Sequence, residues 1–266
     1  MELNGTHWIG LGVRGRINLL GLPRLAQLIV RVSPVALAGM AVPALADIPY
    51  TTDDPGTLAP GEYEILTYSD GTFTSMDFEG EAGIDLSIGI ADNFQLGVTV
   101  PVANFGPQLE TDRFAIGDTT VQAKIGLIAG EPGQLSLSIA PTVAVGMASE
   151  GRSKTGFDLP IWIGTDIGDW SLYGGGANSF SSDEDGGDLP FIGAVVSKRI
   201  IPSLSLGGEF YAQGEGLGGQ KLYLFGPGLA LDFAPGLTLA AAGQAVLGDS
   251  DGNGDFHVFA ALRLAR

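Results

Sequence analysis

The sequence predicts an all-β protein, a transmembrane antiparallel β-barrel of the outer-membrane type with about 12 strands. Three observations predict this fold. Runs in which every second residue is apolar recur along the chain after residue 61. Their connections alternate between short and long, as in a barrel whose termini both lie on the periplasmic side. The number of runs is even, so the last strand can pair with the first and close the sheet.

The first 46 residues differ from the rest of the chain and predict a secretory signal peptide over 1–46. Four arginines face a single acid, Glu2, and an apolar run over 32–42 leads into Pro43-Ala44-Leu45-Ala46. A positive flank, a short apolar core and an Ala-x-Ala end are typical of a cleaved signal. A transmembrane anchor is the alternative, which the shortness of the run and two prolines, Pro34 and Pro43, disfavour.

Residues 47–61 are rich in Pro, Gly, Thr and Asp, and this composition predicts irregular chain. Two placements are open: a partial plug inside the barrel, or a segment that stays in the periplasm. The transmembrane β-barrel is predicted over 62–266.

The clearest strand pattern lies over 79–101. Ile84, Leu86 and Ile88 alternate with Asp85 and Ser87, and the alternation resumes after the turn 91–93. Such a pair of runs predicts a hairpin with one apolar and one polar face. If the apolar face contacts lipid, the hairpin is part of an outer-membrane barrel.

The remaining runs follow the same pattern in order. Runs 169–180, 189–201 and 221–233 alternate less cleanly, which predicts contact with a plug or with each other. The twelve predicted strands are 62–69, 79–90, 93–100, 117–128, 134–146, 156–167, 169–180, 189–201, 203–213, 221–233, 236–246 and 255–265. The longer joints between them are 70–78, 102–116, 147–155, 181–188, 214–220 and 247–254.

Composition excludes several functions. The 266 residues carry a net charge of −17 with few charged residues, which argues against nucleic acid as a partner. Cysteine is absent from the sequence, so neither a disulfide nor a thiolate site is available. The predicted partners are outer-membrane lipid and a small-molecule solute, and no cofactor is predicted.

Several short motifs are spread over the chain: IPYTTDDPGT at 48–57, GEYE at 61–64, IADNFQL at 90–96, GDT at 117–119, Leu159-Pro160 with Trp162, and WSLYGGG at 170–176. They resemble those of a bacterial family of outer-membrane transporters named after the meta-pathway of phenol degradation. The resemblance implies a passive channel or transporter of the outer membrane. None of these motifs is catalytic.

The polar faces of the predicted strands supply the candidate lumen residues. Acids outnumber bases among them, which favours passage of cations or neutral solutes. The alternative is that these charges pair with one another and only satisfy a polar interior. The candidates are Glu79, Glu81, Asp85, Asp118, Lys124, Asp158, Asp166, Glu209, His257 and Arg263.

One loop, 249–255, resembles a calcium-binding loop. Asp249, Asp251 and Asn253 occupy its first, third and fifth positions, and Asp255 follows. Its twelfth position is Ala260 instead of Glu, and no helices are predicted beside it. A plain exposed loop is the alternative, since Asp, Asn and Gly are common in turns.

Enzymatic function is not predicted. Beyond the leader, His257 is the only histidine, and no Gly-x-Ser-x-Gly motif is present in the sequence. The sequence therefore predicts an outer-membrane channel for small solutes, aromatic or hydrophobic ones among them. A closed barrel with a structural or surface-binding role is the alternative, and a secreted soluble β-sandwich is a third possibility.

Overall fold

In a computed structural model, the protein is described over residues 49–74, 77–105, 117–145, 156–181, 189–214, 221–248 and 255–266. Among these residues no helix has the length and hydropathy needed to cross a membrane. They form strands β1 (Tyr63–Phe73), β2 (Phe78–Ala91), β3 (Phe94–Phe105), β4 (Thr119–Ile128), β5 (Ser136–Ile139), β6 (Thr142–Val145), β7 (Gly156–Asp158), β8 (Ile161–Ile167), β9 (Trp170–Ser181), β10 (Leu189–Ile201), β11 (Leu204–Gln213), β12 (Leu222–Ala234), β13 (Leu237–Gly248) and β14 (Phe256–Ala265).

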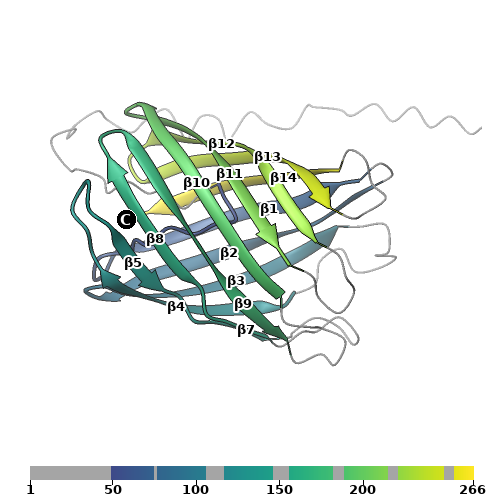
Figure 1. Ribbon diagram of the computed structural model, residues 1–266, viewed down its shortest axis with the longest axis horizontal. Coiled ribbons are helices and arrows are strands. Elements are labelled where there is room, and N and C mark those ends of the chain that lie inside the picture. Colours follow the sequence, from purple (N-terminus) through teal and green to yellow (C-terminus); the bar gives the residue numbers. More distant parts are fainter. Residues whose placement is uncertain are drawn as a thin grey trace, which may run out of the picture. The chain divides into compact units, whose positions relative to one another are not determined.

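The strands close into one antiparallel barrel (Figure 1). Strand β1 pairs with β14 over its length, from Glu64 opposite Ala265 to Phe73 opposite Phe256. Pairing of β9 with β10 completes the ring. Because β5 with β6 and β7 with β8 are each two halves of one strand, the described segments make twelve strands, and the predicted fold class is confirmed.

Two strands that were predicted to be continuous are interrupted. The run 134–146 breaks between Ile139 and Thr142, and the run 156–167 breaks between Asp158 and Ile161. Pro141 and Pro160 lie in these breaks at the same level of neighbouring strands. Proline has no backbone N–H to donate across a sheet, which explains both interruptions.

The first predicted long connection, 70–78, is wrong. Strand β1 continues to Phe73, β2 begins at Phe78, and the pairing passes through Asp70 opposite Glu81. The rings of Phe73 and Phe78 lie 4.6 Å apart at the end of this hairpin. Short and long connections therefore do not alternate strictly, because the polar Ser-Asp-Gly-Thr stretch that suggested a loop is strand.

The outer surface of the barrel is apolar. Ile84, Leu86, Ile88 and Ile90 of β2 are each between 38% and 49% exposed, whereas the residues between them are less exposed. The same holds in β8, where Ile161 and its alternate neighbours are exposed. An apolar side chain exposed at every second position around a closed barrel is the arrangement that a lipid-facing wall requires.

The three strands with unclear alternation have apolar residues on the inner face as well. Tyr173 of β9, Val195 of β10 and Leu224 of β12 are buried, with exposures of 6%, 2% and 4%. This side of the interior is packed, and the chain segment before β1 lies against it, as described next.

Candidate functional site: the barrel interior

Residues 49–61 lie inside the barrel. Thr52 is fully buried, and a Cβ placed on Gly193 of β10 would lie 1.8 Å from its Oγ1. A Cβ on Gly89 of β2 would lie 2.1 Å from the Ala59 carbonyl oxygen. Glycine at these two inner positions therefore leaves the space that the segment occupies. We call residues 49–61 the inner segment.

Glu209 of β11 binds the backbone of the inner segment. The Thr51 N–H donates to Oε2 at 3.1 Å, and the Thr52 N–H donates to Oε1 at 2.6 Å. The Gln244 amide of β13 donates a third hydrogen bond to Glu209, at 2.5 Å. Glu209 is 1% exposed, so these donors replace the water that a carboxylate would otherwise bind.

Two further contacts fix the inner segment on the opposite side of the barrel. Lys124 Nζ of β4 lies 2.7 Å from Asp53 Oδ1, with only 4% of the Lys124 side chain exposed. The Leu58 N–H donates to Gln95 Oε1 of β3 at 2.9 Å. The inner segment is thus held by side chains from both sides of the barrel.

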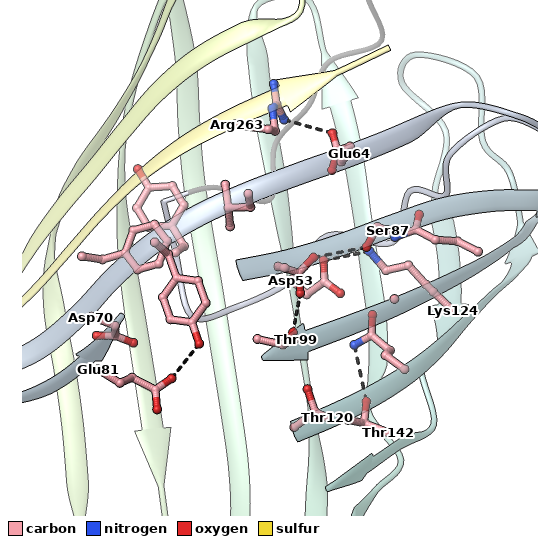
Figure 2. A pocket seen from close by; sticks show the side chains of 18 residues that line it. Asp53, Glu64, Asp70, Glu81, Ser87, Thr99, Thr120, Lys124, Thr142 and Arg263 are labelled. Carbon is pink, nitrogen blue, oxygen red and sulfur yellow. Dashed lines mark hydrogen bonds and ion pairs between the residues drawn. The ribbon is translucent and has the colours of Figure 1, made fainter. Parts of the chain in front are cut away.

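A cavity of about 380 Å³ remains beside the inner segment. Figure 2 shows side chains of β1, β2, β3, β4 and β14 pointing into it. Most of its wall is polar: carboxylates, Lys124, Arg263 and Thr, Ser and Gln side chains. The aromatic part includes Tyr68 and Phe259, whose stacked rings have centroids 6.5 Å apart.

The charges around this cavity are largely engaged with neighbours. Arg263 Nη1 lies 3.5 Å from Glu64 Oε1, and Arg263 Nη2 donates to Thr238 at 3.1 Å (Figure 2). The Tyr68 hydroxyl donates to Glu81 at 2.8 Å, and Thr99 donates to Asp85. The alternative of a cross-paired polar interior therefore describes part of the wall, although carboxylates still outnumber cations.

His257 connects this wall to Glu209. Its Nδ1 lies 2.9 Å from Gln244 Oε1, and its Nε2 lies 2.5 Å from Asp70 Oδ1. Because Gln244 uses its N–H for Glu209, its oxygen faces His257, and Nδ1 must be the donor. The four side chains form a row across β11, β13, β14 and β1, in which hydrogen bonds join Glu209, Gln244 and His257 and an ion-pair contact joins His257 to Asp70.

A second cavity of about 230 Å³ lies beside the short turns of the barrel. Its wall includes Asp166 and the turn residues Gly168 and Asp169, together with Pro49 and Tyr50 of the inner segment. Ser171 donates a hydrogen bond to Asp166. Tyr50 is the only side chain that lines both described cavities.

The predicted lumen residues thus fall into three groups. Glu81, Asp85, Lys124 and Arg263 line the larger cavity and Asp166 the smaller one, while Glu209 and His257 lie in the hydrogen-bonded row. Asp118 and Asp158 are partly buried but line neither cavity, and Asp158 accepts a hydrogen bond from Ser179. Glu79 is exposed beside the β1–β2 connection, away from both cavities.

Three residues of the predicted calcium loop, Asp249, Asp251 and Asn253, lie outside the described residues. Asp255 is described and precedes β14, and its backbone carbonyl accepts from the Val246 N–H at 3.1 Å. The loop stays a prediction. Likewise, the signal peptide over 1–46 lies outside the described residues and stays a prediction.

Several interior residues were missed from the sequence. Glu64, Tyr68 and Asp70 of β1 line the larger cavity. Asp70 falls in the predicted connection 70–78, whereas Glu64 and Tyr68 lie in the predicted strand 62–69 but are not among the predicted lumen residues. Gln95 and Gln244 are uncharged, so the charge pattern of the sequence does not identify them. The signal that could have revealed Gln244 is its position opposite His257 on paired strands.

Comparison with known proteins agrees with this architecture. The fold is that of outer-membrane β-barrel channels and porins. An outer-membrane channel of Pseudomonas putida F1 is similar with a TM-score of 0.64 and 14% identity, over 80% of this chain and 98% of that chain. The KdgM porin, in complex with disordered oligogalacturonate, is similar with a TM-score of 0.56 and 11% identity, over 76% and 98%. The NanC porin matches with a TM-score of 0.56 and 9% identity, over 75% and 98%.

The family is shown by the sequence. The model of the family described as "Putative MetA-pathway of phenol degradation" matches residues 47–264, and the chain belongs to this family. The resemblance inferred from the short motifs is thereby confirmed. No curated protein matches the sequence.

Proposed function

We propose that the protein is a passive channel of the bacterial outer membrane for small solutes. The observation that carries this proposal is a polar cavity of about 380 Å³ inside a closed barrel whose outer face is apolar. A wall of this kind places the barrel in lipid and keeps water and charged side chains inside it. Solutes would diffuse along the interior, and no energy source is required.

The side chains of the interior determine which solutes pass through the barrel. Rings of charge in a narrow pore select by sign, so Glu81 and Asp85 favour cations or neutral solutes over anions. The inner segment narrows the path, because it occupies part of the lumen and is bound by Glu209 and Lys124. We assign it the role of a partial plug.

Small aromatic solutes are the class that we propose first. The stacked pair of Tyr68 and Phe259 offers an aromatic face on the cavity wall, and the neighbouring carboxylates accept hydrogen bonds from hydroxyl groups. The family description refers to phenol degradation, which agrees with this class. We propose no catalytic activity, since both ring nitrogens of His257 contact Gln244 and Asp70.

A closed barrel with a structural role is the second candidate, and the position of the inner segment favours it. Planar-bilayer recordings separate the two candidates. The purified protein and a variant lacking residues 49–61 are compared at the same protein-to-lipid ratio. A channel gives conductance steps that increase when the segment is removed. The absence of steps from both proteins would contradict the channel and leave the structural role.

A further inference from the structure

Tyr50 stands between the two cavities of the interior. Its side chain lines the cavity of about 380 Å³ and also the cavity of about 230 Å³. The larger cavity is lined by strands β1 to β4 and β14. The smaller one opens among the turn residues Gly168 and Asp169 and residues of β10, β11 and β12. A solute that moves from one cavity to the other meets the ring of Tyr50.

The wall of the barrel holds a notch for this ring. Gly207 of β11 and Gly228 of β12 are directly paired across the two strands. A Cβ on Gly207 would lie 2.5 Å from the Tyr50 hydroxyl oxygen, and a Cβ on Gly228 would lie 2.7 Å from a ring carbon. Real Cβ atoms essentially never show such distances, so the ring occupies space that a side chain at either position would need.

The chain on either side of Tyr50 is fixed, which keeps the ring in the notch. Glu209 binds the N–H groups of Thr51 and Thr52, and Pro49 also lies against Gly228. Burial inside the barrel, followed by the charge of Glu209, raises the pKa of the Tyr50 phenol. The hydroxyl therefore stays uncharged at neutral pH, and the barrier that the ring presents is steric.

We propose that Tyr50 is the side chain that divides the lumen and sets the size of the solutes that pass. This inference rests on the proposed channel function. The aromatic ring forms the barrier, and the hydroxyl does not contribute to it. The ring, held in the notch formed by Gly207 and Gly228, sets the width of the path between the two cavities.

Single-channel recording of three variants tests this role. Tyr50→Ala removes the ring and joins the two cavities, so its conductance should rise by about twofold or more, since a constriction dominates the resistance of a pore. Tyr50→Phe keeps the ring and should conduct like the wild type. Tyr223→Ala is the matched control, because Tyr223 of β12 lines neither cavity.

A second measurement leaves Tyr50 in place. Gly228→Ala inserts a methyl group where the ring lies, which pushes the ring from the wall towards the lumen, and should lower conductance, the opposite of Tyr50→Ala. The fold of each variant is checked by its heat-modifiable mobility in detergent gels. Equal conductance of Tyr50→Ala and wild type, or an equal increase with Tyr223→Ala, would overturn the inference. Such a result leaves the proposed channel function intact. If the variant lacking residues 49–61 showed no conductance steps, both the channel function and the role of Tyr50 would be overturned.

Discussion

At the scale of single residues, Glu209 is the position whose burial most requires hydrogen-bond donors. A carboxylate with 1% exposure needs donors for its oxygens, and here they come from the backbone of the inner segment and from Gln244. The side chain therefore does two things at once: it is stabilised by the segment, and it holds the segment. Removing it leaves three donors unpaired, of which those of Thr52 and Gln244 are buried.

Glu209→Ala should release the inner segment while the barrel stays folded. Each unpaired buried donor costs about 1–3 kcal/mol, which the segment can avoid by leaving the lumen, whereas the strand pairing is unaffected. Limited proteolysis in detergent should cut the variant within 49–61 much faster than the wild type. Ser205→Ala on the same strand is the control and should be cut like the wild type. Equal protection of Glu209→Ala would show that Lys124 and Gln95 suffice to hold the segment.

At the scale of elements, the outer face of β2 requires apolar side chains and its inner face polar ones, so residues that are adjacent in the sequence have opposite requirements. Leu86 is 46% exposed on the outer face, and Ser87 lines the larger cavity. Leu86→Lys should destabilise the barrel by about 2–4 kcal/mol, the cost of a lysine on the lipid face near the midplane. Ser87→Lys should cost much less, because its ammonium lies among carboxylates and water.

Urea unfolding of both lysine variants in lipid vesicles measures this difference. The pair is matched in strand, depth and inserted side chain, so only the face differs. If both variants lost similar stability, the assignment of an outer lipid face to β2 would be wrong.

The interrupted strands allow a prediction about backbone pairing. The Ala123 N–H donates to the Pro141 carbonyl, and the Ala140 N–H donates to the Pro160 carbonyl, each at 3.0 Å. In an antiparallel pair of this type both residues normally exchange hydrogen bonds, but the prolines cannot return theirs. The carbonyls of Ala123 and Ala140 face the missing donors.

Pro141→Val and Pro160→Val should each supply that donor and join the two halves of their strand. The expected gain is about 0.5–1.5 kcal/mol per hydrogen bond. Amide hydrogen exchange should slow at residues 139–143 or 158–162, respectively. Unchanged or faster exchange there would mean that the kink is imposed by packing and not by the missing N–H.

How well the sequence predicts a strand depends on whether its outer or its inner face shows a clear residue pattern. The outer face is uniformly apolar, so β2 and the first part of β3 are recovered within a residue or two from alternation alone. The inner face of β1 carries Asp70, and Ser-Asp-Gly-Thr is indistinguishable from a turn until β2 is seen to place Glu81 opposite. The binding of the inner segment to Glu209 is also hidden, because its donors are backbone N–H groups that no residue pattern reveals.

At the scale of the whole molecule, the excess of acidic residues that gives the sequence a net charge of −17 is also found in the interior. The larger cavity is lined by five carboxylates, Asp53, Glu64, Asp70, Glu81 and Asp85, against Lys124 and Arg263 as permanent cations. Lys124 and Arg263 each lie beside one carboxylate, and His257 contacts Asp70. Glu81 and Asp85 accept hydrogen bonds from the hydroxyl groups of Tyr68 and Thr99 and line the cavity, so we expect their charges to act on passing ions.

The open channel should therefore prefer cations. In a salt gradient across a bilayer, the variant lacking residues 49–61 should show a reversal potential of the sign that cation selectivity gives. Glu81→Gln with Asp85→Asn should move this potential towards zero, since both changes keep the size and hydrogen bonding of the side chains. Lys124→Gln removes a cation from the same wall and should move the potential in the opposite direction. If the neutralised carboxylates left the reversal potential unchanged, ions would follow a path that Glu81 and Asp85 do not line, and their assignment to the lumen pathway would have to be withdrawn.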